Sequence, residues 1–168
     1  MVTQEMDQKH IGLQREAWGP RFWRVLHTLA ERSGKQTTEL QNNDEADAWT
    51  NLLRAQAFVM PCDLCKQHYL SWIVSYKINP LRSLLGEDRR VYLRLWLWGC
   101  HDNVNRMNGK ISPAVSGLQE MYSRHIIEKD IKDLETMFRV ATEKQILMAA
   151  DISRWKNALT RLRLMYSL

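Results

Sequence analysis

The chain has 168 residues, a net charge of +5, and 45% hydrophobic against 26% charged residues, a composition typical of one globular domain with a core. Its three cysteines exclude the disulfide framework of a small secreted protein. No stretch has the roughly 18 apolar residues of a membrane helix, and residues 1–9 lack the apolar centre of a classical signal peptide. We therefore expect neither membrane insertion nor classical secretion.

Scarce glycine and proline, with no alternating strand pattern, predict an all-α chain. The first helix is predicted to begin at Pro20, because proline suits a first helical position. Residues 33–43 are polar and predict a loop. A second helix is expected over 44–59, and a third over 62–76 after Pro61 breaks the chain.

A fourth helix is predicted over 88–107, ending at Asn108-Gly109, a common helix stop. Four helices of this length with short connections predict an antiparallel four-helix bundle within residues 1–112. Residues 113–168 are expected to form a C-terminal helical extension, with helices near 118–148 and 151–166. Its apolar positions predict packing against the bundle or a second subunit.

The basic residues near the C-terminus alternate with leucine and methionine. This alternation predicts the solvated face of a terminal helix rather than a nucleic-acid interface. The residues are Arg154, Lys156, Arg161 and Arg163.

Cys62 and Cys65 form a C-x-x-C pair directly after Pro61. One helical turn places both sulfurs on the same side, close enough to bridge. The start of a helix also lowers the pKa of the first thiol, because unpaired backbone N–H groups favour the thiolate. The pair predicts thiol–disulfide chemistry, although the same spacing also supplies half of a zinc site.

Polar and aromatic residues on two other helices predict a ligand. Trp23 and His27 share a helical face, although such a pair by itself is more typical of a core. His101 and Asn105 lie on one stripe of a tryptophan-rich helix, where polar groups need partners. With Lys110 at the helix end to meet phosphate, the set suits a flat aromatic cofactor carrying a pyrophosphate.

Four stretches, in this order and spacing, resemble the FAD-linked sulfhydryl oxidases of the Erv/ALR family. They are W-G-P-x-F-W-x-x-L-H-T at 18–28, Q-x-x-x-x-P-C-x-x-C at 56–65, W-L at 96–97 and H-x-N-V-N-x-x-N-G-K at 101–110. The resemblance covers roughly residues 15–112, and it implies that the bundle holds FAD.

The resemblance also implies roles for individual residues. Cys65 would be the sulfur next to the flavin, and Cys62 the outer sulfur that meets a substrate thiol. A substrate thiolate would attack Cys62, a second thiol would resolve the mixed disulfide, and Cys65 would pass electrons to FAD and then to oxygen, giving hydrogen peroxide. The implied FAD-binding residues are Arg15, Gly19, Trp23, His27, His101, Val104, Asn105 and Lys110, with Arg21 in the same stretch.

The family further implies a dithiol protein substrate, molecular oxygen and a homodimer across bundle helices. It contains members encoded by large DNA viruses, which predicts the host cytoplasm or the virion for a viral protein. For a cellular protein, the mitochondrial intermembrane space or the endoplasmic reticulum is expected. We expect no metal, nucleic-acid or membrane partner.

The chain also departs from the family pattern. Trp98 stands where a bracing cysteine is usual, so Cys100 is expected to be a small buried hydrophobe, with an intermolecular bridge as the alternative. A shuttle cysteine pair is lacking, so a separate dithiol protein would donate directly to Cys62. Pro20 replaces the usual arginine, for which Arg21 could substitute. Either Tyr122 or Trp155 could close the cofactor pocket after Lys110.

Two other functions compete with this prediction. In a zinc-stabilised helical binding module, Cys62, Cys65 and His68 would be ligands, with Cys100 or His101 completing the set. The second competitor is a scaffold of the same family that has lost catalysis.

Overall fold

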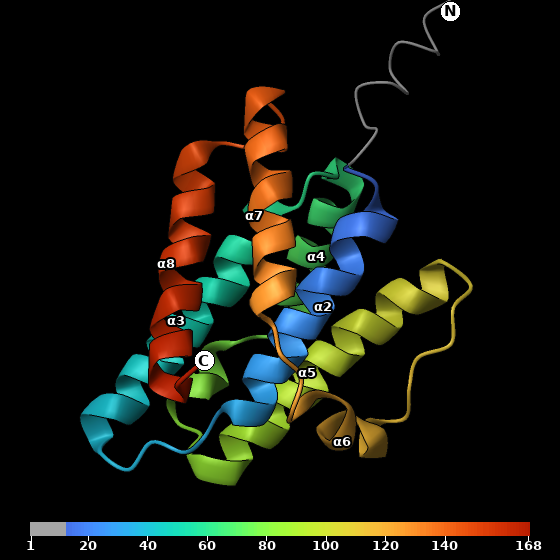
Figure 1. The fold of residues 1–168 in the computed structure, drawn as a ribbon. Helices are drawn as coiled ribbons and strands as arrows, with labels where there is room; N and C mark the ends of the chain where they lie inside the picture. The colour runs from blue at the N-terminus through green and yellow to red at the C-terminus, as the bar shows by residue number, and fades with distance from the viewer. Residues whose placement is uncertain (1–12) are drawn as a thin grey trace, which may run out of the picture.

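The computed structural model describes residues 13–168 and is all-helical over that range, which confirms the predicted fold class. None of the described helices is long and apolar enough to cross a membrane. The bundle helices are α2 (Arg15–Arg32), α3 (Glu39–Gln56), α4 (Asp63–Ser75) and α5 (Gly86–Met107). The C-terminal part contains α6 (Leu118–Tyr122), α7 (Glu128–Glu143) and α8 (Ala149–Tyr166), as Figure 1 shows.

Helix α2 begins at Arg15, so the predicted start at Pro20 is wrong. Proline inside a helix cannot donate to the carbonyl four residues earlier, and its ring usually clashes with the residue before it. Here that residue is Gly19, which has no Cβ to clash. The buried indole of Trp18 donates to the Leu13 carbonyl at 3.0 Å and anchors the turn before the proline.

Helix α3 begins at Glu39, five residues before its predicted start. The side chain of Thr38 accepts from the backbone N–H of Gln41, and the Gln41 side chain accepts from the backbone N–H of Thr38. This capping box satisfies two backbone donors that an uncapped helix leaves unpaired. The predicted polar loop is therefore shorter than 33–43.

Helices α4 and α5 lie within two residues of their predicted bounds. Cys62 caps α4, and Asn108 caps the end of α5. Gly109 follows with a φ of +65°, a left-handed conformation that glycine adopts without steric cost. The sulfurs of Cys62 and Cys65 both lie at the start of α4.

Helices α7 and α8 pack against the bundle, with α7 beside α2 and α8 beside α3 (Figure 1). Their buried residues belong to the same hydrophobic core as those of the four bundle helices. The indole of Trp155 donates to the Gln56 side chain at 2.8 Å, and the indole of Trp49 donates to the Tyr166 hydroxyl at 2.8 Å. The predicted packing of the extension against the bundle is what the structure shows, whereas the domain boundary at residue 112 stays a prediction.

A buried ion pair joins α3, α5 and α8. Arg89 donates to Glu45 at 2.5 Å, and both side chains are fully buried. Glu45 also accepts from the Tyr166 hydroxyl at 2.5 Å and from the Gly34 backbone at 2.9 Å. Because a buried charge without partners is costly, these contacts fix the register of α8 on the bundle.

Candidate active site

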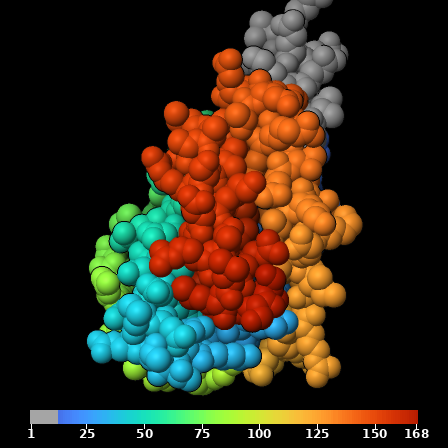
Figure 2. Space-filling model, turned by 60° about the vertical axis from the view of Figure 1, so that its left-hand side comes forward, coloured from blue at the N-terminus to red at the C-terminus, as the bar shows by residue number. Residues whose placement is uncertain are grey.

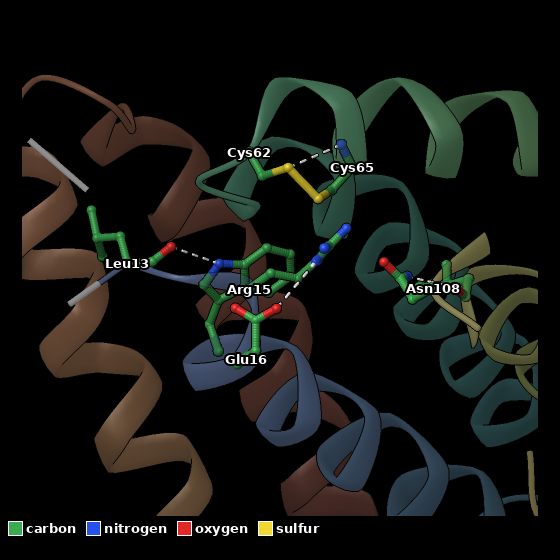
Figure 3. Close-up of a disulfide and its surroundings, with 8 residues drawn as sticks. Leu13, Arg15, Glu16, Cys62, Cys65 and Asn108 are labelled. Carbon is green, nitrogen blue, oxygen red and sulfur yellow. Dashed lines mark hydrogen bonds and ion pairs between the residues drawn. A yellow bond between two sulfur atoms is a disulfide. The ribbon is translucent and has the colours of Figure 1, made fainter. Parts of the chain in front are cut away.

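Cys62 and Cys65 form a disulfide at the start of α4. The backbone N–H of Cys65 donates to the Cys62 sulfur at 3.2 Å, so the first turn of the helix points at the outer sulfur. Figure 3 shows the Arg15 side chain of α2 reaching toward the disulfide, with Asn108, the residue that caps α5, to one side. Both cysteines are partly exposed, so a substrate sulfur can approach the pair.

An apolar cavity of about 190 Å³ lies beside this disulfide, between α2, α4 and α5. Cys65 lines it, while Cys62 is not among the described residues that do. The pair therefore has an inner sulfur, which faces the cavity, and an outer sulfur. The lining residues are Arg15, Trp18, Gly19, Phe22, Trp23, Leu26, Leu64, Cys65, His68, Val104, Met107 and Asn108.

A second, more polar cavity of about 330 Å³ lies next to the first. The two share Arg15, Gly19, Trp23, Val104 and Asn108, so they adjoin; the first is called the apolar lobe and the second the polar lobe. The predicted cofactor-binding residues line the polar lobe, except His27 and Arg21. Its lining is Arg15, Glu16, Gly19, Pro20, Trp23, Arg24, His101, Val104, Asn105, Asn108, Lys110, Met121, Tyr122 and His125.

Stacked rings form one wall of the polar lobe. Trp23 lies flat on His101, with ring centroids 4.2 Å apart and planes 7° apart. Behind it, His27 Nε2 lies 3.3 Å from His101 Nδ1, and the His27 ring stacks on Tyr122 at 4.8 Å. His27 and His101 each contact at least two other rings, which restricts the edge that the wall presents to a ligand.

Both histidines in this wall are neutral near pH 7. Burial, and then the neighbouring His101, lower the pKa of His27 to about 3. Burial also lowers the pKa of His101 to about 4, with Asp102 opposing the shift and Lys110 adding to it. The wall therefore offers neutral donors and acceptors, and the positive charge of the lobe comes from Arg15, Arg24 and Lys110.

Asp130 of α7 holds the rim of the polar lobe in place. It accepts from Arg24 at 2.6 Å, and His125 Nε2 lies 2.9 Å from its other oxygen. Burial alone would raise the pKa of Asp130, but the hydrogen bonds from Arg24 and His125 outweigh it and lower the pKa. The rim is thus a charged contact between α2 and the C-terminal extension.

Residues 20–123 match the model of the Erv1 / Alr family. The chain belongs to the Erv1 / Alr family. It is 30% identical over 111 residues to an FAD-linked sulfhydryl oxidase of African swine fever virus (isolate Tick/Malawi/Lil 20-1/1983), covering 66% of this chain and 83% of that protein. It is 29% identical over 112 residues to the FAD-linked sulfhydryl oxidase of isolate Pig/Kenya/KEN-50/1950, covering 66% and 84%. No solved structure matches the chain.

The two lobes of this Erv1 / Alr chain fit a cofactor with the chemistry of FAD. The apolar lobe, walled by Trp18, Phe22 and Leu26, suits a flat ring system placed against Cys65. The polar lobe carries cationic side chains, among them Lys110, that suit a pyrophosphate. Gly19 lies where the lobes meet, and its missing side chain leaves room there.

Tyr122, rather than Trp155, closes the cavity after Lys110. Tyr122 lines the polar lobe, whereas Trp155 is fully buried in the core and donates a hydrogen bond to the Gln56 side chain. Arg21 is not among the described residues that line either lobe, because it donates to Asp133 of α7 at 3.0 Å. Arg24, one turn from Pro20, lines the cavity on this side instead.

Sequence reasoning missed Arg24 and His125 in this Erv1 / Alr chain. Arg24 sits inside the first motif, but its position there does not show that it meets Asp130, 106 residues away. His125 lies outside all four motifs. Leu64 and Met107, which line the apolar lobe, were also missed, and His68, which lines it too, was considered only as a zinc ligand.

Cys100 is free and buried, as predicted, and burial raises its pKa well above the ordinary value. Cys62 and Cys65 are bonded to each other in a disulfide. Within residues 13–168, no group of three or more His, Cys, Asp or Glu side chains is placed to hold a metal. The zinc-stabilised module therefore lacks a ligand set in the described part of the chain.

Proposed function

We propose that this chain is an FAD-dependent thiol oxidase that forms disulfides in protein substrates through Cys62 and Cys65. The observation that carries the proposal is the disulfide at the start of α4, with Cys65 facing the apolar lobe and Cys62 outside it. The relatives named FAD-linked sulfhydryl oxidase support the same chemistry.

Cys62 is the sulfur that a substrate thiolate attacks, because it lies on the outer side of the pair. The new S–S bond forms between the substrate and Cys62, the Cys62–Cys65 bond breaks, and Cys65 leaves as a thiolate. A second substrate thiolate then attacks the substrate sulfur and releases Cys62. The Cys65 N–H, 3.2 Å from the Cys62 sulfur, stabilises that leaving thiolate.

When bound, FAD accepts the two electrons that return Cys62 and Cys65 to a disulfide and passes them to oxygen, giving hydrogen peroxide. The residues that would hold it surround the two lobes. Trp18, Phe22 and Leu26 would exclude water from the ring system. The His27–His101 wall presents a neutral polar edge. The cations Arg15 and Lys110 would meet the phosphates, beside Arg24, which is held by Asp130.

An absorption spectrum of the purified protein, followed by oxygen consumption with dithiothreitol, tests the proposal. We expect a flavin spectrum and turnover in the unaltered chain. Cys65→Ser should keep the flavin and lose its reduction by thiols, and Cys62→Ser should lose turnover. A colourless protein that binds zinc, or a yellow protein with no turnover above background, would support one of the two competitors.

The electron donor is proposed to be a separate dithiol protein. The family also predicts a homodimer. Because α7 packs along α2 and α8 along α3, we expect a dimer to use the faces of the bundle that these helices leave open. Sedimentation of the purified protein measures this. The African swine fever virus relatives favour the host cytoplasm or the virion as the location.

A further inference from the structure

A groove of about 380 Å³ runs between α3 and α8, outside the site described above. Figure 2 shows the face on which α8 lies between α7 and α3. Ala55 of α3 and Ala158 of α8 line the groove, and their short side chains leave space between the two helices. Exposed arginines from both helices line it too, namely Arg54, Arg154 and Arg161.

The groove is positively charged, because Asp151 is the one acidic residue among the described side chains that line it. Asp151 pairs with Arg154 at 2.8 Å, yet the Arg154 side chain stays 73% exposed. Arg161 lies 3.4 Å from Asp44. Arg54 has no ion pair within residues 13–168. Guanidinium groups bind carboxylates through paired hydrogen bonds, so the groove is complementary to an acidic peptide.

One end of this groove leads to the redox pair. Phe58 lines the groove and is 44% exposed, and Lys66 Nζ lies 5.9 Å from the centre of its ring. Lys66 directly follows Cys65. Phe58 precedes Cys62 by four residues, a length of chain that spans at most about 14 Å. A peptide that leaves the groove at Phe58 therefore needs only about four more extended residues to span the distance to Cys62.

We propose that this groove docks an acidic segment of the dithiol protein substrate, so that α8 takes part in choosing the substrate. The inference rests on the proposed thiol oxidase function and names the class of its substrate. Charge on the groove steers the acidic segment to the enzyme and holds it while the neighbouring thiols reach Cys62. Small dithiols need no such contact and are oxidised without it.

Two synthetic peptides test the proposal by turnover. Both peptides carry one Cys-x-x-Cys motif. About five residues from that motif, one peptide has a block of glutamates and the other a block of lysines. At low salt we expect kcat/KM for the glutamate peptide to exceed that for the lysine peptide by about fivefold. The doubly substituted variant Arg54→Glu with Arg154→Glu should remove this preference and leave dithiothreitol turnover unchanged. High salt should also remove it, because exposed charges are screened.

Arg139→Glu is the matched control, because Arg139 is an exposed arginine of α7 outside the groove. Like each substitution in the groove variant, it reverses the charge of one exposed arginine, but it should leave the preference for the glutamate peptide unchanged. The proposal is overturned if the groove variant oxidises dithiothreitol normally and still prefers the glutamate peptide. It is also overturned if the unaltered protein shows no preference.

A binding measurement separates failure of this inference from failure of the proposed function. The glutamate peptide, fluorescently labelled and with serines in place of cysteines, should bind the unaltered protein and bind the groove variant about fivefold more weakly. Peptide binding without any thiol oxidation would refute the proposed oxidase function and still support the docking groove. Binding of a single-stranded oligonucleotide in place of the glutamate peptide would overturn the assignment.

Discussion

The Tyr122 ring lies flat against the His27 ring, with centroids 4.8 Å apart and planes 15° apart. This contact joins the end of α6 to the middle of α2 and closes the polar lobe behind the stacked pair of Trp23 and His101. A segment outside the four sequence motifs thereby completes the wall of the cavity.

Replacing Tyr122 with alanine should weaken retention of FAD about tenfold, because the wall loses its stacked ring. Tyr122→Phe keeps the ring and should retain the cofactor almost as well. The ratio of flavin to protein absorbance after dialysis measures the effect. If Tyr122→Ala held FAD as tightly as the unaltered chain, Tyr122 would have no part in closing the site.

Replacing Gly34 with alanine should destabilise the fold by about 2–4 kcal/mol. Gly34 has a φ of +74°, and a Cβ there would lie 2.0 Å from the Gly86 carbonyl oxygen, so both the conformation and the close approach require glycine. Gly117→Ala is the control, because a Cβ at Gly117 meets nothing within 4 Å. The free energies of unfolding in urea should differ between the two variants by most of this expected loss of about 2–4 kcal/mol. Equal free energies of unfolding would refute the prediction.

The protein without cofactor should lose stability as the pH falls from about 6.5 towards 4. In the folded state, burial and the neighbouring His101 lower the pKa of His27 to about 3, and burial lowers that of His101 to about 4. The unfolded chain therefore binds protons in this window that the folded chain does not. The free energy of unfolding then falls with pH, by at most about 1.4 kcal/mol per pH unit for each histidine.

Measuring the same dependence in His27→Gln isolates this contribution from that of the carboxylates. The free energy of unfolding of the variant should fall less steeply between about pH 6.5 and 4, whatever its value at pH 7. Identical slopes in the variant and the unaltered chain would mean that His27 is not held neutral by the fold.

Cys100 should be unreactive and dispensable for turnover. It is buried on α5 with a raised pKa, so its thiol is neither exposed nor ionised near pH 7. In the reduced native protein, a thiol reagent should modify Cys62 and Cys65 and leave Cys100 unmodified until denaturant is added. Cys100→Ala should keep oxygen consumption with dithiothreitol, and its loss would assign Cys100 a role in the reaction.

Much of this protein is determined by short stretches of its sequence. The all-α class, the helix that starts at the C-x-x-C, and the helix stop at Asn108-Gly109 follow from local preferences that hold wherever the segment lies. The motifs at 18–28 and 101–110 predicted residues that the fold brings to one cavity. The start of α3, which was predicted five residues too late, also has a local signal, the capping box of Thr38 and Gln41.

Contacts between distant segments were decided only by the tertiary structure. Nothing near Arg24 in the sequence indicates Asp130, and nothing near Tyr122 distinguishes it from Trp155 as the residue that closes the cavity. The groove exists because α8 packs along α3, which brings Arg54 and Arg154 to one surface. Local pattern shows which face of a helix is buried, but the neighbour of that face depends on how all the helices share one core.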